Sequence, residues 1–182
     1  TAKCLVDTAV IAGCDYIKWQ KRTPDLCVPE EQKSKPKSTP WGDMTYIDYK
    51  HRVEFGESDY KELIDYCGDR IKCFASVWDK PSVDFMKPLS NITKIPSALI
   101  TDLDLCKYAR DNFETLIIST GMSTEEEIEK CMEACKPDVV MHTNSTYPSP
   151  TEELNLEYIR YLREKWTAQV GYSGHEYGLV RT

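Results

Sequence analysis

Apolar and polar residues alternate along this chain in segments whose period switches between about two and about 3.6 residues. Short apolar runs predict buried strands, and amphipathic stretches between them predict helices. Six strands are expected, over residues 16–20, 71–76, 92–95, 115–120, 138–142 and 168–171. Helices are expected around 4–12, 60–67, 81–89, 105–109, 123–135 and 158–166.

Local stop and start signals support several of these boundaries. Gly13 is a helix stop, and Asp79 with Pro81 marks a helix start. Ser123 with Glu126 fits a capping box, and Thr101 with Asp104 resembles a second capping pair. These signals place helix starts before residues 82, 105 and 128.

Residues 21–52 follow a different pattern. They contain four prolines, a lysine-rich stretch and the aromatic residues Trp41, Tyr46 and Tyr49. A proline-rich segment of this length is either a linker or a functional loop. The aromatic residues favour a loop that packs on something, and a linker is the alternative.

Strands that alternate with helices predict a parallel sheet with crossover helices. The later units recur every ~20 to 30 residues, as in a (β/α)8 TIM barrel of ~250 residues. We therefore expect an incomplete α/β barrel, with an open doubly wound sheet as the alternative. The absence of GxGxxG and P-loop motifs argues against nucleotide binding. At 182 residues the chain forms one domain or a piece of one.

The charge balance limits the partners. The formal net charge is −7, with 30 acidic and 23 basic residues, so a nucleic-acid or anionic membrane partner is not expected. No apolar run approaches the ~20 residues of a membrane span, and no signal peptide is evident. The chain lacks an initiator methionine and begins within a predicted helix, so we expect a fragment.

Eight cysteines lie in apolar, periodic segments without a CxxC pair. We interpret them as buried thiols of a reducing compartment, which predicts a cytoplasmic protein. Cys131 and Cys135 lie four residues apart without a second ligand pair nearby, which gives little support for zinc.

Polar residues gather at the carboxyl ends of the predicted strands, where barrel enzymes keep their sites. Two lysines with hydroxyl and amide groups would suit a phosphate or carboxylate. The residues are Lys18, Gln20, Ser76, Lys94, Ser97, Ser119, Thr120, Asn144, Ser145, Tyr147, Ser173 and His175.

The last of these strand ends, Gly171–Glu176, sets a hydroxyl, an imidazole and a carboxylate within four residues. On its own this stretch fits either half of a polar site or an ordinary turn with a surface histidine.

Several motifs together resemble the N-acetylneuraminate (sialic acid) synthase family, in order and over essentially the whole chain. They are Lys18-Trp19-Gln20-Lys21-Arg22, Lys37-Ser38-Thr39-Pro40-Trp41-Gly42, Lys94-Ile95-Pro96-Ser97, Ile118-Ser119-Thr120-Gly121-Met122, Ser145-Thr146-Tyr147-Pro148 and Gly171-Tyr172-Ser173-Gly174-His175.

The resemblance implies a TIM-barrel transferase of sialic acid biosynthesis that condenses phosphoenolpyruvate with N-acetylmannosamine. It implies a divalent metal, Mn²⁺ first and Mg²⁺ or Co²⁺ as alternatives, and a homodimer of the full-length protein. The implied catalytic residues are Lys18, Lys94, Tyr147 and His175, with His175 as a metal ligand. The implied substrate-binding residues are Gln20, Ser76, Ser97, Ser119, Ser145 and Ser173.

The chain also departs from the family pattern. Leu99 stands where the best-known members carry a carboxylate, and Ser145 replaces an asparagine found in some members. Against the family, strands two to seven are expected within residues 1–182, without the first and last strands, a second metal-binding histidine or the C-terminal antifreeze-like domain.

Two other functions stay open beside sialic acid synthesis. One is a synthase of legionaminic or pseudaminic acid that acts on a related N-acyl sugar. The other is a barrel fragment that binds without catalysis. The remaining histidines are not expected in the site: His51 is predicted to be solvated and His142 to be a hydrogen-bonded core residue.

Overall fold

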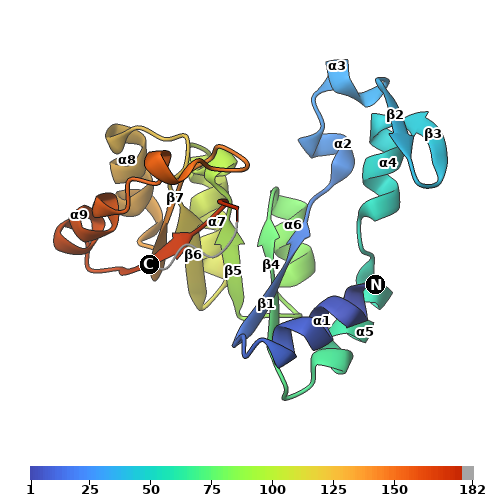
Figure 1. Ribbon diagram of the computed structural model, residues 1–182, viewed down its shortest axis with the longest axis horizontal. Coiled ribbons are helices and arrows are strands. Elements are labelled where there is room, and N and C mark those ends of the chain that lie inside the picture. The colour runs from blue at the N-terminus through green and yellow to red at the C-terminus, as the bar shows by residue number, and fades with distance from the viewer. Residues whose placement is uncertain (178–182) are drawn as a thin grey trace. The chain divides into compact units, whose positions relative to one another are not determined.

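The structure is a computed structural model that describes residues 1–177 (Figure 1). The chain divides into two compact units, Thr1–Ser90 and Asn91–Thr182. Both units contain parallel strands connected through helices. The predicted parallel α/β organisation is therefore confirmed in each unit.

The first unit is built on the parallel pair of β1 (Tyr16–Lys21) and β4 (Lys72–Val77), with Tyr16 opposite Lys72. Helices α1 (Ala2–Ile11), α5 (Glu57–Cys67) and α6 (Lys80–Met86) accompany it. The alternation of β1 sends Ile17 and Trp19 into an apolar cluster with residues of α1 and α5. The opposite face of β1 therefore carries Tyr16, Lys18 and Gln20, which are exposed.

The segment after β1 folds into elements of its own. These are α2 (Pro24–Cys27), α3 (Glu30–Lys33), the antiparallel hairpin of β2 (Pro36–Thr39) and β3 (Gly42–Thr45), and α4 (Tyr46–Val53). The Arg52 guanidinium lies 4.8 Å from the centre of the Trp41 ring, and the Lys50 ammonium lies 4.9 Å from that of Tyr46. The linker alternative for residues 21–52 is therefore wrong, because cation–π contacts and a hairpin order the segment.

The second unit is a four-stranded parallel sheet in the order β5 (Ile92–Ile95), β6 (Thr115–Ser119), β7 (Val139–Thr143) and β8 (Gln169–Ser173). The crossovers are α7 (Leu103–Asn112), α8 (Glu125–Cys135) and α9 (Glu157–Lys165), with 3-10 turns at Ser97–Leu99 and Thr151–Glu153. The core is formed by buried residues of strands and helices together: Ile95, Leu116, Ile118, Val140, Leu105, Cys106, Ile128, Cys131 and Leu162.

Two predicted caps are displaced by one residue. Helix α8 begins with a capping box of Thr124 and Glu127, one residue after the predicted pair, because the Ser123 hydroxyl donates to the Gly121 carbonyl instead. Helix α7 is capped by Asp102, which accepts from Leu105 N at 2.9 Å, and not by Thr101. The Asp79 cap of α6 is confirmed.

The cysteines are only partly buried. Cys67, Cys106, Cys131 and Cys135 are buried, while Cys27 and Cys73 are half-buried. Cys4 and Cys14 are exposed, so the expectation of uniformly buried thiols is wrong at these two positions. Both lie on or just after α1, which buries only Val6 completely and leaves its outer face in solvent.

The two histidines outside the predicted site behave differently. His142 is buried, and its Nε2 donates to the Leu154 carbonyl at 2.7 Å, which confirms a core histidine. His51 is half-exposed as expected, but its Nε2 also lies 3.1 Å from Asp25 Oδ2. None of the helices within residues 1–177 combines the length and apolar character that crossing a bilayer requires.

Candidate functional site

Two serine hydroxyls meet at Gly121, which follows β6. The Ser97 Oγ accepts a hydrogen bond from Gly121 N at 3.1 Å. A Cβ on Gly121 would lie 2.2 Å from the Ser145 Oγ and 3.0 Å from the Ser97 Oγ. Only glycine leaves room for both hydroxyls here. The carboxyl ends of β5, β6 and β7 thus bring two of the predicted binding residues together around a backbone amide.

Ser119 lies two residues before that glycine and is 1% exposed. Its buried Oγ finds no hydrogen-bond partner among the described residues. Buried hydroxyls in native proteins are nearly always paired, so an unpaired one calls for an explanation. A ligand oxygen at the carboxyl end of β6 would provide the missing partner.

Tyr147, which follows β7, and His175, which follows β8, lie against each other at the carboxyl ends of these strands. The ring centres lie 4.8 Å apart in an edge-on arrangement, and 81% of Tyr147 is exposed. His175 Nδ1 lies 2.8 Å from the Asn144 carbonyl oxygen. Because a carbonyl only accepts, Nδ1 carries the proton and Nε2 keeps its lone pair. This hydrogen bond prepares His175 to act as a ligand or a base through Nε2.

The first unit places Gln20 and Ser76 next to the last residues of β1 and β4, whereas Lys18 lies in the middle of β1 and not at its carboxyl end as predicted. Gln20 stands opposite Ser76 in the strand register, and Ser76 is buried. Lys18 reaches solvent, yet the surrounding protein partly desolvates its ammonium and lowers its pKa. An ammonium whose hydration is reduced gains more from an anionic ligand.

The remaining predicted residues belong to the second unit. Lys94 lies in β5 opposite Ile117 of β6, and Ser173 ends β8 opposite Thr143. Glu176, which follows His175, accepts a hydrogen bond from the Tyr172 hydroxyl at 2.9 Å. Burial is the larger cause and the Glu176 carboxylate the smaller one that together raise the pKa of Tyr172 to about 12, so the Tyr172 hydroxyl is a donor at neutral pH.

Two residues near the predicted site carried no recognised signal in the sequence. Arg22 donates to the Gln20 side chain, and Glu54 holds Arg22. Arg22 ends the Lys18–Arg22 motif without a predicted role, and Glu54 lies 32 residues further along the chain. Their contact is a product of the fold of residues 22–54.

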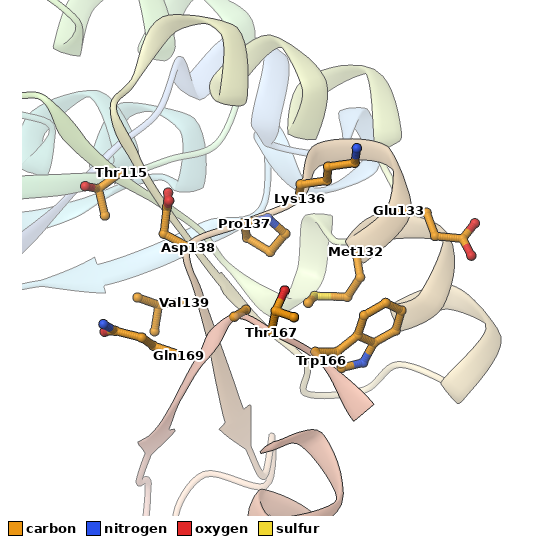
Figure 2. A pocket seen from close by; sticks show the side chains of 11 residues that line it. Thr115, Met132, Glu133, Lys136, Pro137, Asp138, Val139, Trp166, Thr167 and Gln169 are labelled. Atoms are coloured by element: carbon orange, nitrogen blue, oxygen red, sulfur yellow. The ribbon is translucent and has the colours of Figure 1, made fainter. Parts of the chain in front are cut away.

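A cavity lies elsewhere, at the amino ends of β6, β7 and β8 (Figure 2). Its volume is about 750 Å³, and none of the predicted site residues lines it. Asp138, on its wall, accepts from Arg110 Nη1 at 2.6 Å and from Leu116 N at 2.7 Å. These contacts tie the turn after α8 to β6, which is a structural role.

The side chains that could hold a metal ion do not form a cluster in the described part of the chain. Within the described residues there is no cluster of three or more His, Cys, Asp or Glu side chains suited to a metal. His175 fits as one ligand, because its Nδ1 hydrogen bond leaves Nε2 available. The described part of the chain therefore offers one donor and not a complete ligand set.

A parallel α/β unit with hydroxyls and a lysine towards the carboxyl ends of its strands places this chain among the barrel-type α/β proteins. The comparisons with known proteins make this specific. Residues 5–182 match the model of the NeuB family, and the chain belongs to that family.

The relatives agree on this family. The chain is 32% identical to N-acetylneuraminate-9-phosphate synthase of Drosophila melanogaster, over 99% of this chain and 51% of that protein. It is 30% identical to N,N'-diacetyllegionaminic acid synthase of Campylobacter jejuni, over 98% of this chain and 57% of that protein. The chain spans about half the length of the curated relatives it matches.

A solved structure supports the fold class. N-acetylneuraminic acid synthetase from Leptospira borgpetersenii superimposes with a TM-score of 0.86 at 26% identity, over 97% of this chain and 60% of that one. The expectation that the chain forms part of a barrel is confirmed, and the open doubly wound alternative is set aside.

Proposed function

We propose that this chain is part of a synthase that condenses phosphoenolpyruvate with N-acetylmannosamine to give N-acetylneuraminate and phosphate. The observation that carries the proposal is the pair of hydroxyls, Ser97 and Ser145, that flank the Gly121 amide in a NeuB-family chain. Hydroxyl donors and lysine ammonium groups suit the phosphate and carboxylate of phosphoenolpyruvate.

Each residue has a proposed task in this reaction. Phosphoenolpyruvate is held by Lys18, Lys94, Ser97, Ser119 and Ser173, with Ser76 and Ser145 beside them. Gln20 and Tyr147 face the sugar. Holding the two substrates in contact is a large part of such catalysis, because it removes the entropy cost of their encounter.

The bond changes follow from the two substrates. The methylene carbon of phosphoenolpyruvate forms a carbon–carbon bond with the aldehyde carbon of the open-chain sugar, whose oxygen takes a proton. Water adds to the carbon that carries the phosphate, and the bond from that carbon to the phosphate oxygen breaks. The buried Ser119 hydroxyl and the Ser97 hydroxyl, whose oxygen accepts from the Gly121 amide, would stabilise the departing oxyanion.

A divalent metal, Mn²⁺ first, belongs to this proposal, with His175 Nε2 as one ligand. When bound, it would polarise the aldehyde oxygen of the sugar. The tasks assigned above to the lysines and the hydroxyls do not depend on it. A homodimer of the full-length protein and a cytoplasmic location are further parts of the proposal.

A related N-acyl sugar is the second candidate substrate. The names of the relatives include legionaminic, pseudaminic and N-acetylneuraminate-9-phosphate synthases, so the sugar differs within the family. Leu99, which follows the Lys94–Ser97 motif, favours a sugar that needs no carboxylate partner at that position.

The test is phosphate release from phosphoenolpyruvate by the full-length protein. We expect release to depend on an N-acyl sugar and on added Mn²⁺, and Lys94→Met to lower kcat/KM for phosphoenolpyruvate at least about 100-fold. Lys72→Met is the matched control, because Lys72 lies at the amino end of β4 against the Tyr16 ring. Release that does not depend on the sugar, or equal rates for both variants, would contradict the assignment.

A further inference from the structure

The Gln20 side chain is oriented by a neighbour. Arg22 Nη2 lies 3.3 Å from the Gln20 Oε1. A guanidinium has five N–H donors and no acceptor, so only the oxygen of the carboxamide can face it. The NH₂ group of Gln20 is therefore directed away from Arg22. The backbone is fixed as well, since the buried Tyr60 hydroxyl donates to the Gln20 carbonyl at 3.1 Å.

Arg22 is itself held in place. Its Nε donates to Glu54 Oε2 at 3.2 Å, and its backbone N donates to Glu54 Oε1 at 2.9 Å. The guanidinium also lies 5.5 Å from the centre of the Trp78 ring. Only 18% of the Arg22 side chain and 9% of the Glu54 side chain are exposed. An arginine restrained at three points keeps its free N–H groups in one direction.

We propose that Arg22, held by Glu54, is a positioning residue that turns the Gln20 carboxamide so that its two N–H donors face the sugar. This inference rests on the proposed function and deepens it. The groups that two N–H donors recognise are oxygens, such as the carbonyl of an N-acyl group or a sugar hydroxyl. Arg22 does not touch the substrate and acts only through Gln20.

The charge of Arg22 is matched locally, which separates this role from anion binding. Glu54 contacts Arg22 and also lies 3.6 Å from the Lys21 ammonium, which donates to the Phe55 carbonyl at 2.8 Å. A cation paired with a carboxylate attracts phosphoenolpyruvate less than Lys18 does, because the Lys18 side chain is exposed to solvent. Loss of Arg22 should therefore affect the sugar more than phosphoenolpyruvate.

The experiment compares Gln20→Met, Arg22→Met and the double variant in the full-length protein. The KM values for N-acetylmannosamine and for phosphoenolpyruvate are measured separately, with the dissociation constant of the sugar from calorimetry. We expect each single variant to raise the sugar KM about 5- to 10-fold and to leave the phosphoenolpyruvate KM within about twofold. The double variant should be no worse than Gln20→Met, because Arg22 acts through that side chain.

Arg70→Met is the matched control. Arg70 also pairs with a carboxylate, Asp7 at 3.0 Å, and lies against an aromatic ring, Tyr66 at 4.7 Å, but it belongs to the α1–α5 side of the unit. We expect unchanged KM values for it.

Three outcomes would overturn the inference: additive effects in the double variant, an equal rise of both KM values, or an unchanged sugar KM in Arg22→Met. Absence of phosphate release in the unaltered protein would instead count against the proposed function. The calorimetric constants would still decide whether Arg22 orients Gln20.

Discussion

Gly121→Ala should damage the site far more than the fold. The added Cβ would lie 2.2 Å from the Ser145 Oγ, 3.0 Å from the Ser97 Oγ and 3.2 Å from the Thr143 carbonyl oxygen. A relaxed carbon–oxygen contact is roughly 1 Å longer than the shortest of these, so the Ser145 hydroxyl must leave its position. A serine side chain can rotate away, which limits the cost in unfolding free energy to about 1–2 kcal/mol.

The effect on catalysis follows from the same displacement. Misplacing a substrate-holding group by about 1 Å can cost on the order of 100-fold in rate. We therefore expect Gly121→Ala to lower kcat/KM for phosphoenolpyruvate about 10- to 100-fold, measured as initial rates of phosphate release by the full-length protein. Denaturant unfolding of the same preparations gives the stability.

Two further variants separate the causes. Ser145→Ala removes the hydroxyl itself, so the Gly121→Ala/Ser145→Ala double variant should be no slower than Gly121→Ala and should regain stability. Gly56→Ala is the control, because a Cβ there meets only Asp59 Oδ2 at an ordinary 3.5 Å. Gly56→Ala changes the N-cap residue of α5, so we expect it to lower the unfolding free energy by up to about 1 kcal/mol and to leave the rate unchanged. A Gly121→Ala rate above half that of the unaltered protein would refute the reasoning.

Two other predictions concern stability. Burial alone would raise the pKa of Asp79, but hydrogen bonds from Ser82, Thr23 and Cys27 outweigh it and lower that pKa from its ordinary 3.8. The stabilisation is therefore present above pH 3.8 and lost as the pH falls through the lower, folded-state pKa. We expect Asp79→Asn to cost about 1–3 kcal/mol of unfolding free energy at neutral pH and to weaken the fall of that free energy with decreasing pH. An unchanged pH dependence in urea titrations would contradict this. His142→Phe leaves the Leu154 carbonyl without its donor at 2.7 Å, and we expect a loss of about 1–3 kcal/mol in denaturant unfolding with kcat within about twofold. A His142→Phe variant that is inactive but fully stable would place His142 in the site after all.

The regular elements could be predicted because their signals are local. The strands β4 to β7 are short runs rich in apolar residues, and helices such as α8 carry apolar residues at the spacing that one buried face requires. The sequence alone does not identify the cap of α8, because Ser123 and Thr124 both precede a glutamate by three residues. Which hydroxyl caps the helix is decided by the hydrogen bond of Ser123 to Gly121, which lies outside the helix.

Residues 21–52 could not be predicted in the same way. Their order depends on contacts between residues far apart in the chain: Thr23 N donates to Asp79 Oδ2 at 2.6 Å, and Arg22 N donates to Glu54. Periodicity carries no information about such pairs. The proline content indicates an irregular segment. The Glu54 and Asp79 carboxylates fix the position of its first residues, Arg22 and Thr23.

The same distinction applies within the candidate site. Residue type and position at a strand end could be predicted for Gln20 and His175, but the atom each presents could not. The Gln20 oxygen faces Arg22, and the His175 Nδ1 proton faces the Asn144 carbonyl, 31 residues away in sequence. In both cases a contact that the sequence does not reveal decides whether the side chain offers a donor or a lone pair. Arg22→Met tests the proposed chemistry more selectively than deletion of Gln20, because it changes the orientation of the carboxamide and leaves that group in place.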